Sequence, residues 1–149
     1  MKLLVQRVEK AEVLVNQAVV GSIPKGLLVF LGIHQEDTAS CIEPLVSKLV
    51  NLRIFSNDQD KKDLSLLDVK GAILLVSQFT LYGDCSKGRR PDFFSAAPAS
   101  KAEPLYEQFL AALKRTNLEV ASGRFGAHMK VSLVNDGPIT LILESKSCK

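Results

Sequence analysis

Residues 2–23, KLLVQRVEKAEVLVNQAVVGSI, set the architecture of the chain, because apolar and polar residues alternate along them in short runs. Such alternation is typical of antiparallel strands that bury one face and leave the other in water. Asn16 and Gln17 interrupt the pattern and predict a hairpin turn. Residues 26–33, GLLVFLGI, are almost wholly apolar, which indicates a central strand that is buried on both faces.

Two segments carry apolar residues at helical spacing. Asp37 or Thr38 can cap the first helix, which is expected to end near residue 53 and whose apolar residues are Ile42, Leu45, Val46, Leu49 and Leu52. Ser100 and Glu103 fit a capping box for the second helix, whose apolar face consists of Leu105, Phe109 and Leu113.

The remaining segments are expected to be strands and loops. Between the helices we expect a polar loop at 56–63, a strand at 72–81 and a basic loop at 82–93. After the second helix we expect a strand ending at 134, a turn at 135–138, a last strand from 139 and a frayed tail at 145–149. The prediction is one α+β domain over 1–149: a mostly antiparallel sheet that curls into a partly closed barrel, with two main helices on one face.

Composition limits the possible functions. The chain has 149 residues, 46% hydrophobic and 23% charged, which fits one globular domain. No apolar run approaches the roughly 20 residues that span a bilayer, so no membrane association is expected. Polar residues interrupt the N-terminal segment, which is unlike a signal peptide and predicts a cytoplasmic protein. The net charge of +3 permits an RNA partner without arguing for one.

Three common kinds of site are unlikely on sequence grounds. The only histidines are His34 and His128, and no G-x-S-x-G elbow is present, which argues against a nucleophile triad. These histidines and the three cysteines lack metal-ligand spacing, so no metal is predicted. The stretch GRFGAHMK, residues 123–130, lacks both phosphate-binding fingerprints and reads as a glycine-rich entry to a strand, so no cofactor is predicted.

The stretch SQFTLYGD, residues 77–84, is the strongest candidate. Ser77 and Gln78 place polar side chains in a strand that is otherwise apolar, and buried polar groups need partners. Two interpretations stay open: a strand end that meets a loop, or the lip of a pocket where side chains and backbone N–H groups meet a ligand. The basic residues Lys87, Arg89 and Arg90 follow; they form a solvated face or contact a phosphate-bearing substrate.

Two long motifs resemble one family. The stretches VSQFTLYGDCSKGRRPDF (76–93) and GRFGAHMKVSLVNDGPIT (123–140) closely resemble the D-aminoacyl-tRNA deacylases of the D-tyrosyl-tRNA deacylase type, and QRV, GLLVFLGI and NLRIFSND follow the family in order and spacing. The resemblance covers nearly the whole chain; Gly83, Cys85, Ser86 and Arg89 lie in a loop that varies within the family. It implies hydrolysis of the ester between a D-amino acid and the 3′-terminal adenosine of tRNA, and action on glycyl-tRNA mischarged on tRNA-Ala.

The resemblance also implies a homodimer without metal or cofactor, with active sites at the subunit interface. One wall of the pocket would be Ser77, Gln78, Phe79 and Thr80, and Gly137–Pro138, joined by a cis peptide bond, would reach in from the other subunit. Carbonyl oxygens of that pair would hold the substrate ammonium and exclude the side chain of an L-amino acid. Backbone N–H groups near Phe79 and Thr80 would stabilise the oxyanion, while the substrate's 2′-OH assists and the Thr80 hydroxyl only positions.

Further roles follow from the same resemblance. Phe79 would orient the terminal adenine, and Arg7 would support the Gly-Pro loop; as an exposed strand residue Arg7 would do nothing. The substrate pocket would also include Phe125, Ala127 and Met129, although Met129 can equally be core packing. The acceptor-stem phosphates would be held by Lys87, Arg89 and Arg90. Two rival functions stay open: a non-catalytic RNA-binding domain of the same fold, and a general ester hydrolase that uses Thr80 or Ser77.

Overall fold

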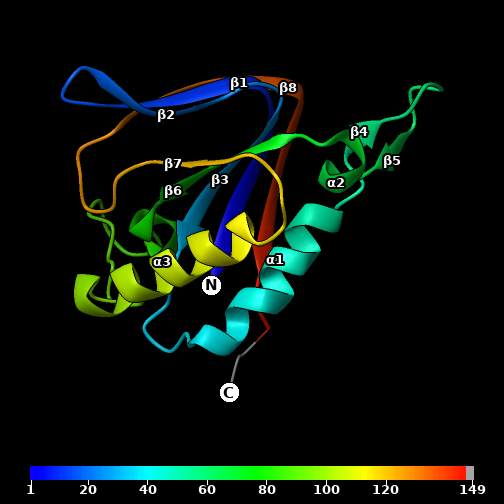
Figure 1. The fold of residues 1–149 in the computed structure, drawn as a ribbon. Coiled ribbons are helices and arrows are strands. Elements are labelled where there is room, and N and C mark those ends of the chain that lie inside the picture. Colours follow the sequence, from blue (N-terminus) through cyan, green and yellow to red (C-terminus); the bar gives the residue numbers. More distant parts are fainter. Residues whose placement is uncertain (147–149) are drawn as a thin grey trace.

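The computed structural model describes residues 1–146, and its main feature is one bent sheet with two helices against it (Figure 1). The sheet strands are β1 (Lys2–Val15), β2 (Ala18–Ile23), β3 (Gly26–Gly32), β6 (Ala72–Ser77), β7 (Val120–Ser122) and β8 (Lys130–Glu144). The main helices are α1 (Ile42–Asn51) and α3 (Ala99–Lys114). The short elements are η1 (Ala39–Cys41), β4 (Phe55–Ser56), β5 (Lys62–Leu64), α2 (Leu66–Val69) and η2 (Phe79–Tyr82).

Strand β1 organises the sheet. One edge of β1 pairs with β8 along its whole length, and the other edge pairs first with β3 and then with β2, all antiparallel. The order continues through the parallel pairs β3–β6 and β6–β7, which the crossovers through α1 and α3 make possible. Strand β7 then returns to β2, where a Cβ built on Gly21 would lie 2.4 Å from the Ser122 carbonyl oxygen. The sheet thus closes almost into a barrel, which confirms the predicted fold class.

The core has two compartments on opposite faces of the sheet. Leu27, Val29 and Leu31 of β3 point into the cluster beneath α1 and α3, whereas Leu28 points into the barrel. Strand β6 alternates in the same way, with Ile73 and Leu75 on the helix side. Burial on both faces explains why these strands have almost no polar residues, as predicted for 26–33.

The structure bears on three local predictions, which concern a turn, a loop and the C-terminal tail. Asn16 and Gln17 both have positive φ in the β1–β2 turn, which confirms the hairpin. The segment 56–63 is not only a loop, because β4 and β5 form a small hairpin there. The expected tail at 145–149 lies partly outside the described residues, which end at 146.

None of the helices built from the described residues is long and apolar enough to cross a membrane.

The predicted helix caps are wrong. Neither Asp37 nor Thr38 caps α1, because η1 precedes that helix and the Asp37 carboxylate instead accepts the His34 N–H and pairs with the Met1 amine, both at 2.6 Å. Helix α3 begins at Ala99, since the Pro98 carbonyl already accepts the N–H groups of Lys101 and Ala102; Ser100 therefore lies inside the helix. A capping box does occur, between Ser65 and Asp68 of α2.

The predicted turn at Asn135–Pro138 is also wrong, because β8 runs unbroken through these residues. Gln6 and Val8 of β1 pair with Thr140 and Asn135 of β8, so one residue of β1, Arg7, faces the four residues 136–139 of β8. The turn-forming residues therefore bulge out of a continuous strand instead of reversing it. We call residues 136–139 the Gly-Pro bulge.

Candidate functional site

A cavity of about 300 Å³ opens where β3 and β6 end beside the start of α3. Its floor is apolar, formed by Leu31 and Ile33, and one wall consists of the small residues Ala97, Ala99 and Ala102. The opposite side contributes polar groups through Ser77, Gln78 and Phe79, and the loop after β7 adds Phe125 and Gly126. An apolar cavity with a few polar groups at one edge is the usual form of a small-molecule site.

The polar edge is a short 3₁₀ turn and not the strand predicted for 72–81. Strand β6 ends at Ser77, after which the Gln78 N–H still donates to the Leu31 carbonyl at 2.8 Å. Residues 79–82 then form η2, whose first N–H groups, those of Phe79 and Thr80, have no acceptor among the described residues. Free N–H groups at the start of a helical turn are suited to a negatively charged oxygen.

Side chains beneath η2 hold it in place. Lys2 donates to the Leu81 carbonyl at 3.4 Å, and its ammonium lies 4.9 Å from the centre of the Tyr82 ring. The Tyr82 ring also meets His34 edge-on, with 5.2 Å between ring centres. Burial raises the pKa of Tyr82 well above its usual range, followed in effect by the Asp37 and Glu144 charges. Tyr82 is therefore a neutral phenol at neutral pH and no base.

The hydroxyl of Thr80 has no basic partner. The Gln78 side-chain amide donates to it, and this is the one side-chain hydrogen bond that Thr80 makes among residues 1–146. Of the histidines, His34 uses Nδ1 to accept the Glu36 N–H at 3.1 Å, and His128 lies in an exposed part of the loop after β7. A nucleophile–base pair is thus absent from the described part of the site.

The structure separates the three predicted residues of the loop after β7. Phe125 lines the cavity, and its ring lies 5.6 Å from that of Tyr106, whose hydroxyl donates to the Leu75 carbonyl at 3.2 Å. Burial raises the pKa of Tyr106 to about 12, so this contact persists across the physiological range. Ala127 and Met129 pack instead against the cluster inside the barrel. The Met129 sulfur would lie only 2.6 Å from a Cβ built on Gly123.

The basic residues lie in the loop after η2. Lys87, Arg89 and Arg90 are exposed and make no ion pair with any described residue. A two-way backbone bridge between Asp84 and Asp92, at 2.7 and 2.9 Å, closes the loop. The loop emerges next to the start of α3 (Figure 1).

The Gly-Pro bulge lies outside this cavity. The Gly137–Pro138 peptide bond is cis, Gly137 has a φ of +123°, and both residues are exposed. Neither residue pairs with β1 and neither lines the cavity of the same chain. The structure thus brings Ser77, Gln78, Phe79 and Phe125 together at the cavity, whereas Thr80, Gly137 and Pro138 are not among its lining residues.

Arg7 is buried and holds the bulge. Its Nη1 donates to the Ile54 carbonyl at 2.6 Å, and its Nε lies 3.2 Å from the carbonyl oxygen and 3.1 Å from Oδ2 of Asp136. The alternative interpretation, in which Arg7 is an exposed strand residue without a role, is therefore wrong. Arg7 is not among the residues that line the cavity; it fixes the backbone directly before Gly137.

Replacing Arg7 with alanine is expected to lower the free energy of unfolding by about 2–3 kcal/mol, because the buried Ile54 carbonyl and the partly buried Asp136 carbonyl lose their donor. Asp136→Asn is the matched control: it removes the charge but keeps the backbone carbonyl, and its half-exposed ion pair contributes less than about 1 kcal/mol. Urea unfolding of both variants measures the difference. Equal losses would contradict the role given to Arg7.

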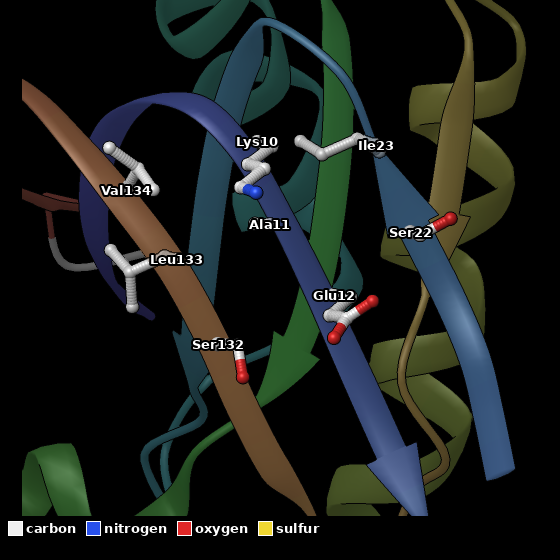
Figure 2. Close-up of a pocket in the computed structure, with 8 residues that line it drawn as sticks. All are labelled: Lys10, Ala11, Glu12, Ser22, Ile23, Ser132, Leu133 and Val134. Carbon is white, nitrogen blue, oxygen red and sulfur yellow. The ribbon is translucent and has the colours of Figure 1, made fainter.

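A second and larger cavity, about 370 Å³, lies on the surface of the sheet (Figure 2). Side chains of β1, β2 and β8 line it, among them Lys10, Glu12, Ser22 and Ser132. It contains none of the predicted site residues and no free backbone donors of a helical turn. We therefore place the candidate site at the smaller cavity, where polar groups converge.

Comparison with known proteins gives consistent matches. The sequence profile of the family described as D-Tyr-tRNA(Tyr) deacylase matches residues 4–144. The D-aminoacyl-tRNA deacylase of Thermosipho africanus is 54% identical over 146 residues, which is 98% of each chain. That of Desulfatibacillum aliphaticivorans is 56% identical over 146 residues, 98% of this chain and 100% of the relative.

Two solved structures share the fold. One, titled c-Myc DNA Unwinding Element Binding Protein, superposes with a TM-score of 0.92 at 43% identity and covers 98% of this chain and 99% of its own. The other, titled a probable eukaryotic D-amino acid tRNA deacylase, has a TM-score of 0.84 at 19% identity, covers 95% and 97% of the two chains, and shows the fold alone.

Proposed function

Because this chain belongs to the D-Tyr-tRNA(Tyr) deacylase family, we propose that it hydrolyses the ester between a D-amino acid and the 3′-terminal adenosine of tRNA, and that it also removes glycine mischarged on tRNA-Ala. The products are the free amino acid and tRNA. Membership in the family, over residues 4–144, is the observation that carries the proposal, and it makes the chain a hydrolase of the aminoacyl-tRNA ester. The chain acts as one domain in the cytoplasm, where its substrate is found.

In this proposal the cavity beside α3 takes the terminal adenosine. Its apolar floor and the exposed Phe79 ring offer surfaces for the adenine, and the ester then lies over η2. Water attacks the ester carbonyl with help from the substrate's own 2′-OH. The free N–H groups of Phe79 and Thr80 stabilise the oxyanion that forms, and one such donor contributes roughly 10²–10³ in rate.

Selection against L-amino acids needs a second copy of the chain. Gly137 and Pro138 are exposed, unpaired with β1 and absent from the cavity of their own chain, so a homodimer can insert them into the partner's cavity. Their carbonyl oxygens then accept the substrate ammonium. An L-amino acid would direct its side chain at these carbonyls or leave its amine unpaired, and an unpaired buried donor costs about 1–3 kcal/mol or more.

The proposal is tested by following deacylation of D-Tyr-tRNA and L-Tyr-tRNA. Release from the D-form alone is expected. If tyrosine is released from neither substrate, the result favours the non-catalytic RNA-binding alternative. Cleavage of small esters that lack a nucleoside favours the general ester hydrolase. Gel filtration or native mass spectrometry measures the dimer.

Replacing Thr80 with alanine is expected to lower kcat on D-Tyr-tRNA by less than about tenfold, because the hydroxyl lacks a base and only positions. Ser77→Ala is the companion variant, with the same expectation. A loss of about 10⁴ in kcat for Thr80→Ala would show a covalent nucleophile and overturn this mechanism.

A further inference from the structure

Phe94 is the most exposed large hydrophobic residue among residues 1–146, at 78%. A single exposed aromatic residue needs no explanation, but Phe94 directly follows Phe93, which contacts Phe79. The rings of Phe79 and Phe93 meet edge-on, with 5.2 Å between their centres, and Phe79 lines the candidate cavity. We call these three residues the aromatic strip: Phe79 lines the cavity, Phe93 contacts Phe79, and Phe94 follows Phe93 in the chain and is exposed to solvent.

The backbone around Phe94 is fixed on both sides. The Phe94 N–H donates to the Asp92 carboxylate at 2.6 Å, and Asp92 is itself bridged to Asp84. Downstream, the Ser95 carbonyl accepts the Gln35 N–H at 3.0 Å, and the Ala97 N–H donates to the Ile33 carbonyl at 2.9 Å. An exposed ring on a fixed backbone loses little conformational freedom when it binds a ligand.

The charges beside the strip point to an anionic partner. Lys87, Arg89 and Arg90 are exposed and unpaired within the described chain, whereas the carboxylates of Asp84 and Asp92 accept the N–H groups of Ser86 and Phe94. Exposed aromatic rings next to unpaired cations are typical of surfaces that bind single-stranded nucleic acid, where bases stack and phosphates meet the cations.

We infer that Phe94 stacks on an unpaired nucleotide just before the terminal adenosine of the tRNA, while Lys87, Arg89 and Arg90 meet the adjoining phosphates. This inference rests on the proposed function, because it continues the path of the substrate outward from the cavity. It adds a contact that distinguishes whole tRNA from its terminal nucleoside. Phe94 is a binding residue here and touches no reacting atom.

Loss of stacking is tested with Phe94→Ala on two substrates. On D-Tyr-tRNA, kcat/KM is expected to fall about 5- to 100-fold, because stacking on one base contributes about 1–3 kcal/mol. On 3′-O-(D-tyrosyl)adenosine, which lacks the preceding nucleotides, no change is expected. Phe94→Tyr keeps the ring and restores activity on tRNA. Val19→Ala, at a 55% exposed position of the β1–β2 hairpin, is the matched control and leaves both substrates unaffected.

A direct binding test does not depend on turnover. The chain contains no tryptophan, so Phe94→Trp introduces a single tryptophan whose emission can be excited apart from that of the tyrosines. Uncharged tRNA-Tyr with its full 3′ end is expected to quench the emission, whereas the same tRNA trimmed of its unpaired 3′ nucleotides is expected not to. Because no ester is cleaved, quenching supports the contact even if the deacylase assay fails.

Three results would overturn the inference. The first is an equal loss of Phe94→Ala on both substrates, which would mean that the ring acts through the cavity. The second is absence of quenching by the intact tRNA. The third is conversion of the Phe94→Ala protein to monomers, which would show that a second copy of the chain covers the ring.

Discussion

Gly137→Ala is expected to lower kcat/KM on D-Tyr-tRNA by about 100-fold while activity on L-Tyr-tRNA stays at its low level, since a misplacement of about 1 Å in a site can cost that much. Gly137 has a φ of +123°, a backbone conformation that residues other than glycine rarely adopt. An added Cβ would also lie 3.0 Å from Ile139 Cγ1 and 3.2 Å from Arg7 Nη2. The backbone must rotate, and the carbonyls proposed to hold the ammonium rotate with it.

Gly88→Ala is the matched control for this variant. Gly88 also has a positive φ, +67°, but a Cβ there would meet no heavy atom within 4 Å. The ratio of D to L activity is expected to be unchanged, because both substrates share the same tRNA. Thermal unfolding and native mass spectrometry check that Gly137→Ala is folded and keeps the oligomeric state of the unmodified protein. A kcat/KM within about threefold of the unmodified enzyme would contradict the role of the bulge.

The second substitution with a large expected effect on kcat/KM is one that fills the candidate cavity. Ala99 is exposed at the start of α3 and lines the cavity of about 300 Å³, so the indole of Ala99→Trp takes the space proposed for the adenosine. Removing the buried contacts of a nucleoside is expected to lower kcat/KM by about 100-fold, equivalent to about 2.7 kcal/mol. Both D-Tyr-tRNA and 3′-O-(D-tyrosyl)adenosine are affected, which separates this variant from those of Phe94.

Ala111→Trp tests whether the effect belongs to the cavity. Ala111 is an exposed alanine of the same helix, and it lies at a different depression formed with α1. Ala111→Trp costs less than about 1 kcal/mol in helix propensity and is expected to leave kcat/KM within about twofold. If both variants lose activity equally, or Ala99→Trp keeps it, the adenosine binds elsewhere.

The alternation of residues predicts most of the sheet because each strand is buried on at least one face. Period-2 patterns identify β1 and β2, an apolar run identifies β3, and helical spacing identifies α1 and α3. The error at β8 has a physical reason: Asn, Asp, Gly and Pro favour a turn and a bulge alike, and only pairing with β1 distinguishes the two. The helix caps failed because the Pro98 carbonyl and η1 start the helices before any side-chain cap is needed.

The candidate site was predictable only where its residues carry a chemical signal. Ser77 and Gln78 are conspicuous because they interrupt an apolar strand, and Phe125 follows from family resemblance. The opposite wall, Ala97, Ala99 and Ala102, could not be found, since alanine carries no polar group that would mark a site. Ala127 and Met129 are not among the residues that line the candidate cavity, because they pack against the cluster inside the barrel.

The N–H groups of Phe79 and Thr80, which have no acceptor among the described residues, belong to the backbone and not to side chains. Mutation therefore cannot easily remove them, which matters for genetics and for inhibitor design. A substitution at Phe79 or Thr80 exchanges a side chain but leaves the amide in place, unless it introduces proline. Alanine replacement at these two positions therefore leaves the oxyanion donors untested, whereas replacement of Gly32 is expected to disturb them, because its Cβ would lie 3.1 Å from the Gln78 carbonyl oxygen and from Leu81 Cβ. An inhibitor anchored on those amides would leave the protein few single-step routes to resistance.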